Sequence, residues 1–280
     1  MALPRTAEHR SCFGKLRKEC RIRAVPFVGG VESGPQGVPL TSQKVTTMHY
    51  FALLLGPEST SAPDPDAQAA EMAAYEAFHA KAATAIRAGD ALTPSSTGVR
   101  ITGGPDAPTV TDGPFAESAE VAGGYYVFDA ENLDEALALA RDIPAAKYGA
   151  VEIWPIVEYF PPSKPLGKSW LALLLEPPAN AHAPGTPEWD AGITQHQKFG
   201  AAAGDRTNGG AALHPPATAT TVRVRDDQVL LTDGPYVEGA EVANGFYFID
   251  VGDRDEAVKV ASMIPATTVE LRQLMGISGL

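Results

Sequence analysis

Apolar and polar positions along the chain predict short strands and amphipathic helices in an order that occurs twice. The first series begins with the apolar run "HYFALLLGPE" at 49–58, and the second begins with "SWLALLLEPP" at 169–178. Both runs have the length of a strand, and both are closed by proline, which cannot donate to a strand ladder. A series that begins again in the second half of the chain predicts two related domains.

A helix is predicted after each of these strands, at 67–88 and at 187–203, because apolar side chains recur there at spacings of three and four residues. In the first helix the recurring positions are Met72, Tyr75, His79, Ala82 and Ile86. In the second helix they are Trp189, Ile193 and His196, followed by Phe199. Each helix is therefore expected to turn one histidine toward its own sheet.

Strand periodicity returns after each helix. "TGVRI" at 97–101 and "TTVRV" at 220–224 alternate apolar and polar residues, and each leads through a turn into a strand that ends at TDGP. Three further elements complete each series. They are an aromatic strand ("GGYYVFD" and "NGFYFID"), a helix with an acidic first turn ("DEALALA" and "DEAVKVA") and a final strand ("AVEIWPIVEY" and "VELRQLM"). The predicted order is strand, helix, hairpin, strand, helix, strand, twice over.

This order predicts an α+β fold of two tandem ferredoxin-like domains. An antiparallel sheet with helices on one face leaves its other face apolar, so we expect the two sheets to pack face to face as an intrachain pseudo-dimer resembling a dimeric α/β-barrel. The predicted boundaries are a first domain at 48–159, a proline-rich linker at 160–168 and a second domain at 169–280.

A longer motif recurs within this plan. "TDGPFAESAEVAGGYYVFD", beginning at Thr111, returns as "TDGPYVEGAEVANGFYFID", beginning at Thr232, with twelve of nineteen positions identical. Asp-Gly is a common turn dipeptide and proline ends a ladder, so a turn alone accounts for one TDGP. The recurrence makes Asp112 and Asp233 candidates for a shared role as well.

His79 and His196 each lie in an H-x-K triplet on the apolar helix face. One such histidine is commonly a hydrogen-bonded core residue, whereas two at equivalent positions favour a common function. An aspartate bonded to one ring nitrogen orients the ring and raises its basicity, which leaves the other nitrogen to transfer a proton. We therefore predict two general acid–base pairs, His79 with Asp112 and His196 with Asp233.

This chemistry requires neither a metal nor a cofactor, and none is predicted. The other histidines, which are His9, His49, His182 and His214, form no cluster with Asp or Glu at metal-ligand spacing. The sequence has no phosphate-binding loop, dinucleotide fingerprint or nucleophile elbow. Arg100 and Arg223, at matching places in the two halves, are the predicted substrate-binding residues for an anionic group.

Charge is distributed unevenly along the 280 residues, whose net charge is −12. Residues 1–47 contain eight Lys or Arg and three Glu, so the remainder is more acidic than the total suggests. An acidic body repels phosphate backbones, which argues against nucleic-acid binding by the folded domains. The basic segment lacks periodicity and predicts a disordered tail, with a targeting or nucleic-acid-binding arm as the alternative; Met48 is a candidate for the natural start.

Cellular location is predicted from the cysteines and from the beginning of the chain. Cys12 and Cys20 both lie in the basic segment and match no zinc pattern. That segment has no apolar h-region of a secretory signal, and no apolar run has the length of a membrane span. We therefore predict a reducing, cytoplasmic location without membrane contact.

At these residues the chain resembles the YCII-related family, in particular its DGPF branch. The resemblance rests on "DGPF" at 112–115, on "DGPY" at 233–236, on the helix histidines and on the strands and helix around them. It covers nearly all of 48–280 as two copies. It implies a dimeric α/β-barrel assembly and a His–Asp active site in each copy, at the pairs named above.

Two classes of function follow. The doubled His–Asp pairing predicts a cofactor-independent lyase, isomerase or hydrolase acting on a small polar or aromatic metabolite, and relatives in the family include a dehydrochlorinase of a chlorinated aromatic. DGPF proteins are often encoded beside extracytoplasmic-function sigma factors, which implies a non-enzymatic module that binds a small molecule or a protein partner such as a sigma factor. A histidine nitrogen within about 3.2 Å of its aspartate, beside a pocket, would favour the enzyme.

Overall fold

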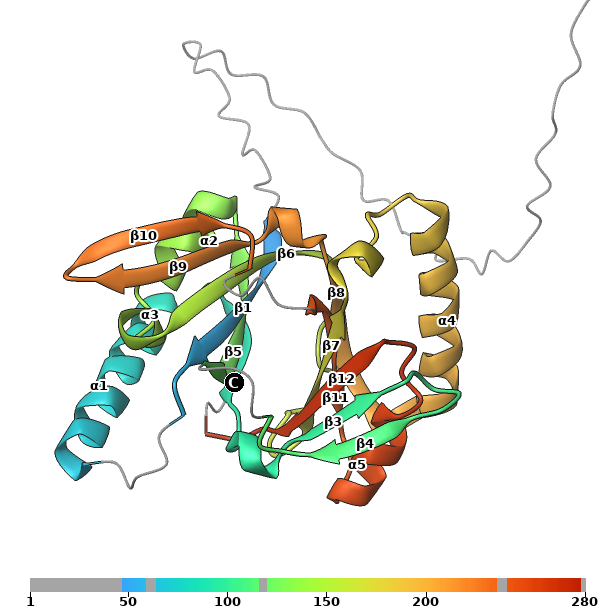
Figure 1. Cartoon of the computed structure of the whole chain (residues 1–280). Coiled ribbons are helices and arrows are strands. Elements are labelled where there is room, and N and C mark those ends of the chain that lie inside the picture. Colours follow the sequence, from blue (N-terminus) through green and yellow to red (C-terminus); the bar gives the residue numbers. More distant parts are fainter. Residues whose placement is uncertain (1–46, 59–63, 116–119, 236–240, 278–280) are drawn as a thin grey trace, which may run out of the picture. The chain divides into compact units, whose positions relative to one another are not determined.

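The computed structural model describes residues 47–58, 64–115, 120–235 and 241–277 (Figure 1). Chain contacts group 44–280 into one unit, apart from 1–43. The predicted basic tail and both cysteines lie outside the described residues, as do 116–119 and 236–240, a range that includes Tyr236.

The first half of the larger unit contains six strands and three α-helices among its described residues. In chain order they are β1 (Met48–Gly56), α1 (Pro65–Ala82), β2 (Ile86–Ala91), β3 (Val99–Thr102), β4 (Thr109–Asp112), β5 (Val121–Ala130), α2 (Leu133–Ala140), α3 (Ala145–Tyr148) and β6 (Ala150–Phe160). The Asp64 side chain accepts a hydrogen bond from the Asp66 N–H and Pro65 opens the helix, so α1 begins with two favourable start signals.

The second half repeats this order except for α3. Its elements are β7 (Trp170–Glu176), α4 (Pro187–Ala203), β8 (Thr207–Leu213), β9 (Thr220–Arg225), β10 (Gln228–Asp233), β11 (Val242–Ile249), α5 (Arg254–Ala261) and β12 (Thr268–Gln273). The helix predicted at 187–203 is confirmed at both ends. Thr186 caps it by accepting from the Trp189 N–H, and Pro187 again occupies the first turn.

The strands form one antiparallel sheet that confirms the α+β class. The order is β2-β5-β1-β6 in the first half and β8-β11-β7-β12 in the second, so the first and third main strands are central in each. This is the strand order of a ferredoxin-like unit with an added hairpin. Each hairpin joins the sheet of the other half, because β3 pairs with β12 and β9 pairs with β6.

Two strands, β2 and β8, differ from the prediction. The first helix was expected to reach 88, but it ends at Ala82, and Ile86 pairs with Phe128 in the sheet. Ile86 continues the helical spacing by chance, and the glycine- and alanine-rich sequences of β2 and β8 carry no strand periodicity. Gly89 is required by close approach, since a Cβ there would lie 2.3 Å from the ring of Tyr126.

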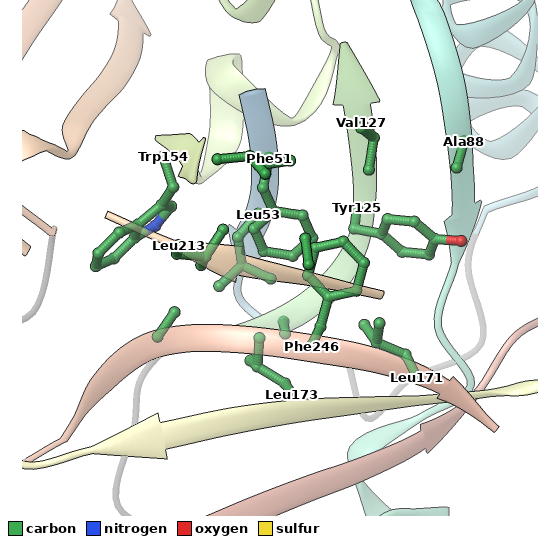
Figure 2. Close-up of a cluster of buried hydrophobic side chains, with 14 of the residues drawn as sticks. Phe51, Leu53, Ala88, Tyr125, Val127, Trp154, Leu171, Leu173, Leu213 and Phe246 are labelled. Carbon is green, nitrogen blue, oxygen red and sulfur yellow. The ribbon is translucent and has the colours of Figure 1, made fainter. Parts of the chain in front are cut away.

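Three apolar clusters stabilise this arrangement. The central cluster contains residues of both halves, and Figure 2 shows Phe51, Leu53 and Tyr125 beside Leu173 and Phe246. The Phe51 and Phe246 rings are stacked with centroids 4.6 Å apart. The other two clusters lie between each half's sheet and its helices. The helix–sheet contact is what places the two histidines.

Candidate functional site

His79 contacts the central strand β5 of its own half. Its Nε2 lies 2.7 Å from the hydroxyl oxygen of Tyr126, and the histidine is half-buried. Burial raises the pKa of Tyr126, so the hydroxyl keeps its proton at neutral pH and can donate to the ring. A neutral imidazole that accepts at Nε2 carries its own proton on Nδ1. A hydroxyl can also accept, so the tautomer with its proton on Nε2 makes the same contact, and the tyrosine fixes the orientation of the ring with either tautomer.

His196 forms the corresponding contact in the second half, through its other ring nitrogen. Its Nδ1 lies 3.0 Å from the hydroxyl oxygen of Tyr247 on β11. Burial lowers the pKa of His196 to about 4 and raises the pKa of Tyr247 to about 12. At neutral pH this pair is therefore a neutral hydrogen bond between helix and sheet.

The structure does not bring the predicted His–Asp pairs together. Among the described residues, the side chain of Asp112 is exposed at the end of β4 and pairs with Arg254 of α5. Asp233 is exposed at the end of β10, opposite Thr220. Each aspartate lies on the hairpin that joins the sheet of the other half, so it is carried away from the helix of its own half.

The two predicted substrate-binding arginines are engaged with carboxylates. Arg100 Nη2 lies 3.3 Å from Glu270 Oε2, and its guanidinium lies 4.9 Å from the ring centroid of Phe115. Arg223 Nη2 lies 2.9 Å from Glu120 Oε2. The lining of the cavity described next does not include either arginine. The expectation that they bind an anionic substrate there is therefore not supported by their positions.

A cavity of about 680 Å³ opens beside His79. It lies between α1, the ends of β1 and β2, the start of β5 and the segment that follows β12. Its lining includes His79, Tyr126, Tyr75, Tyr148, Asp90 and Arg272. The volume is that of a typical small-molecule site, which combines apolar surface with a few polar groups.

A chain of hydroxyl groups forms the wall nearest α1. The Tyr148 hydroxyl donates to Glu71 Oε1 at 2.6 Å, and the Tyr75 hydroxyl lies 3.3 Å from that of Tyr148. Burial raises the pKa of both tyrosines. They therefore remain neutral at physiological pH and offer hydrogen bonds to a ligand beside an apolar ring surface.

Another part of the lining contains Asp90 and Arg272. The Asp90 carboxylate accepts hydrogen bonds from the N–H groups of Ala91, Gly276 and Ile277 at 2.8, 3.0 and 3.3 Å. Burial raises the pKa of Asp90, although these three bonds act in the opposite direction. Arg272 donates through Nη1 to Glu270 Oε1 at 3.2 Å. This part of the lining joins the first half to the end of the second.

Comparison with known proteins identifies the part of the chain that contains α1 and Tyr126. The family model of the YCII-related domain matches residues 50–159. Residues 50–159 form a YCII-related domain. His79 and Tyr126 both lie within it, whereas Arg272 and the segment 275–277 lie outside it.

Two further similarities are more limited. A curated protein of Rhizobium meliloti (strain 1021), named as uncharacterised, is 45% identical over 58 residues, which are 20% of this chain and 47% of that protein. The chain thus spans about half the length of this relative. A solved structure whose title names a chlorite dismutase is similar over 82% of this chain and 95% of its own, with 9% identity and a TM-score of 0.37.

Two other kinds of feature are absent from the residues that the structure describes. No group of three or more His, Cys, Asp or Glu in the described ranges could hold a metal ion. Within the same ranges, no helix is long and apolar enough to cross a membrane.

Sequence reasoning found the histidine of the YCII-related domain but missed its surroundings. Tyr126 stood within the repeated aromatic strand, where it was interpreted as a core residue. Tyr75 shared the helical face of His79, and this spacing was the available signal for a polar wall. Asp90 and Arg272 carried no signal, because they lie far apart in the sequence and meet through the pairing of the two halves.

Proposed function

We propose that the cavity of the YCII-related domain binds a small molecule and that His79 exchanges a proton with it. The observation that carries this proposal is one imidazole, oriented by the Tyr126 hydroxyl at 2.7 Å, at the wall of a 680 Å³ cavity. Tyr126 takes the orienting role that the sequence had assigned to Asp112. In the tautomer that donates its Nε2–H to the tyrosine oxygen, Nδ1 has a free lone pair and can accept a proton from the ligand.

The reaction class that fits this arrangement is cofactor-independent proton transfer, as in a lyase, isomerase or hydrolase. A neutral tyrosine orients the ring but stabilises its protonated form less than a carboxylate would. The rate contribution expected from one such acid–base group is about 10²–10⁴-fold. His79 is accordingly proposed as the group that touches the substrate, with Tyr126 as its positioning residue.

The charges of the lining favour a neutral or cationic ligand over an anionic one. The described lining contains the carboxylates of Glu58, Glu71, Glu76 and Asp90, against the single guanidinium of Arg272. Opposite charges attract and like charges repel most strongly where water is partly excluded. The tyrosine rings and Met72 add apolar surface, so a small amine with an aromatic or aliphatic part is the ligand class we propose.

Deuterium exchange tests the proton-transfer role directly. A library of small amines and carbon acids would be incubated with the protein in D2O, and deuterium incorporation would be measured by mass spectrometry. His79→Gln should lower any catalysed incorporation by at least about 10²-fold, because the base is lost. His196→Gln is the matched control and should leave it unchanged. Equal incorporation by the His79→Gln variant would overturn the catalytic role.

A second candidate function is protein binding, and one surface favours it. Strand β10 pairs with β9 and lies off the main path of the sheet. Its side chains Val229, Leu230 and Leu231 are exposed. A sigma factor is the partner suggested by the family resemblance, and a cytoplasmic location remains a prediction from the sequence. Loss of co-elution with a co-encoded sigma factor in Leu231→Asp would support this function, and unchanged co-elution would count against it.

We also propose that residues 169–280 are a second copy of the same domain and that the two sheets close as a barrel-like pseudo-dimer. Three observations support this. The strand order is the same in both halves, the histidine–tyrosine contact recurs, and β6 pairs with β8 while Leu92 bridges to Leu274. The proposed linker at 160–168 follows the last strand of the first half.

A further inference from the structure

Strand pairing defines two corresponding places, one beside the helix histidine of each half. Tyr126 lies opposite Gly89 of β2, and Tyr247 lies opposite Gly210 of β8. Each tyrosine hydroxyl bonds to a histidine of the helix above it. Residues that lie the same number of positions along the strands from these pairs can therefore be compared between the two halves.

The next residues in register differ in chemistry between the two places. Asp90 lies opposite Tyr125, whereas Ala211 lies opposite Phe246. Tyr125 and Phe246 are both buried in the central cluster (Figure 2). A carboxyl and a phenol hydroxyl in the first half are thus replaced by a methyl group and an unsubstituted ring in the second.

The strands that cross from the other half can be aligned in the same way. Leu213 of β8 pairs with Ile156 of β6. Leu92, which follows β2, forms a bridge with Leu274, which follows β12. These two pairings are equivalent. Leu213 corresponds to Leu92, and Ile156 of β6 corresponds to Leu274, which follows β12.

Trp154 of β6 lies two residues before Ile156, and Arg272 of β12 lies two residues before Leu274. The two residues are therefore counterparts. Trp154 is fully buried and belongs to the central cluster, beside Leu213 (Figure 2). Arg272 lines the cavity of the first half. A large apolar ring therefore occupies one place, whereas in the other the corresponding residue is an arginine that bonds to the Thr93 carbonyl and to Glu270 and lines the cavity.

The two junctions between the halves differ in how far the backbone pairing extends. Between β6 and β8 the pairing continues, whereas after β12 an aspartate side chain takes its place. Residues 158–160 of β6 go on to pair with 210–212 of β8. At the other junction the chain leaves the sheet after a single bridge, and the Asp90 carboxylate holds the N–H groups of Gly276 and Ile277 instead. The cavity lies where the backbone pairing between the residues after β2 and the residues after β12 ends.

We propose that, of these two places among the described residues, only the one beside His79 is a ligand site, and that the second half completes it with Arg272 and the segment 275–277 held by Asp90. The corresponding place in the second half is closed by Trp154 and by the continued ladder of β6. This inference rests on the proposed binding role of the cavity. It makes Asp90 and Arg272 positioning residues, which hold this part of the cavity lining in place.

Access to the two places can be measured without a known ligand, with the small neutral nitroxide TEMPOL as the probe and the full chain as the sample. Paramagnetic loss of NMR intensity would be compared at two buried amides of the first half, Gly124 and Leu92, and at their two counterparts, Gly245 and Leu213. We expect intensity to be lost at the first-half amides and retained at the second-half amides.

Reciprocal substitutions sharpen the comparison. Arg272→Trp should fill the cavity and restore intensity at the first-half amides, whereas Arg272→Lys, its control, should not. Trp154→Ala should open the second place and cause loss at the second-half amides, whereas Trp154→Phe should not. If Trp154→Ala does not fold, Arg272→Trp alone decides the matter.

Three results would overturn the inference: equal loss in both pairs of amides, loss in neither pair, or a loss that survives Arg272→Trp. His79→Gln separates this inference from the proposed function. That variant should keep the TEMPOL pattern of the unaltered chain while it abolishes proton exchange with substrate. A single accessible site without proton exchange would leave the inference standing and remove the catalytic role.

Discussion

At the scale of single residues, the orientation of His79 depends on a tyrosine hydroxyl rather than on a carboxylate. The residue types and the helical face of both histidines were readable from the sequence. Their partners were not, because the aspartates sit on hairpins whose pairing with the opposite half leaves no periodic signal. Tyr126 and Tyr247 occupy identical positions in the repeated motif, and a buried hydroxyl there needed a partner. The need of this hydroxyl for a hydrogen-bond partner was the signal in the sequence that could have identified the tyrosines as partners of the histidines.

Tyr126→Phe tests this orienting role. The substitution removes one hydrogen bond without changing the ring, so we expect a loss of about 1 kcal/mol in the free energy of unfolding. The balance between the two tautomers of the His79 ring should change, which ¹⁵N chemical shifts of the imidazole report. Tyr247→Phe is the matched control and should alter the signals of His196 alone. An unchanged tautomer at His79 in Tyr126→Phe would argue against the role.

His196 predicts a pH dependence of stability. Burial lowers its pKa from 6.5 to about 4, so between these values the unfolded chain binds a proton that the folded protein does not. Stability should therefore fall as the pH drops below 6.5 and should level off below 4. Allowing for partial exposure of the ring, the loss is about 1–3 kcal/mol.

Urea unfolding at neutral and acidic pH, compared between the unaltered chain and His196→Gln, isolates this contribution from that of the carboxylates. The variant should lose less stability on acidification. Equal losses in the two proteins would show that the histidine is not buried as described.

At the scale of elements, predictability followed the strength of the local pattern. The helix at 187–203 was predicted from its apolar spacing, and in the structure Thr186 and Pro187 mark its start. The strands β2 and β8 were missed because their small residues serve the ring of a neighbouring tyrosine rather than a buried apolar face. The same tyrosine positions the histidine, so the least predictable strands are those that build the site.

Gly89→Ala tests that link. A Cβ at this position would lie 2.3 Å from the Tyr126 ring, so the ring must move and its contact with His79 should be lost. We expect a destabilisation of about 1–3 kcal/mol from the overpacking. Gly123→Ala is the control, because a Cβ there meets nothing within 4 Å. Denaturant unfolding measures the loss, and an unperturbed His79 signal in Gly89→Ala would contradict the account.

At the scale of the whole unit, the two halves share one central apolar cluster. The sequence predicted two related series and an apolar contact between their sheets. It could not predict that each hairpin would join the other half, since register across halves is set by the assembled sheet. The site follows from that assembly, because one wall belongs to the YCII-related domain and the other to the end of the second half.

A shared cluster predicts that the halves unfold together. Phe246→Ala removes a fully buried ring stacked on Phe51 and should cost about 3–5 kcal/mol. The imidazole signals of His79 and His196 should disappear at the same urea concentration, in this variant as in the unaltered chain. Separate transitions for the two signals would show that each half is stable alone.

The central claim is that ligands enter the cavity beside His79, and NMR of the two imidazoles during addition of benzylamine and of benzoate tests it most directly. The two probes share a ring and differ in charge. The account predicts that benzylamine shifts the His79 signals at lower concentration than benzoate does, while the His196 signals stay in place. Equal shifts at both histidines, or a His79 ring that responds to neither probe, would contradict it.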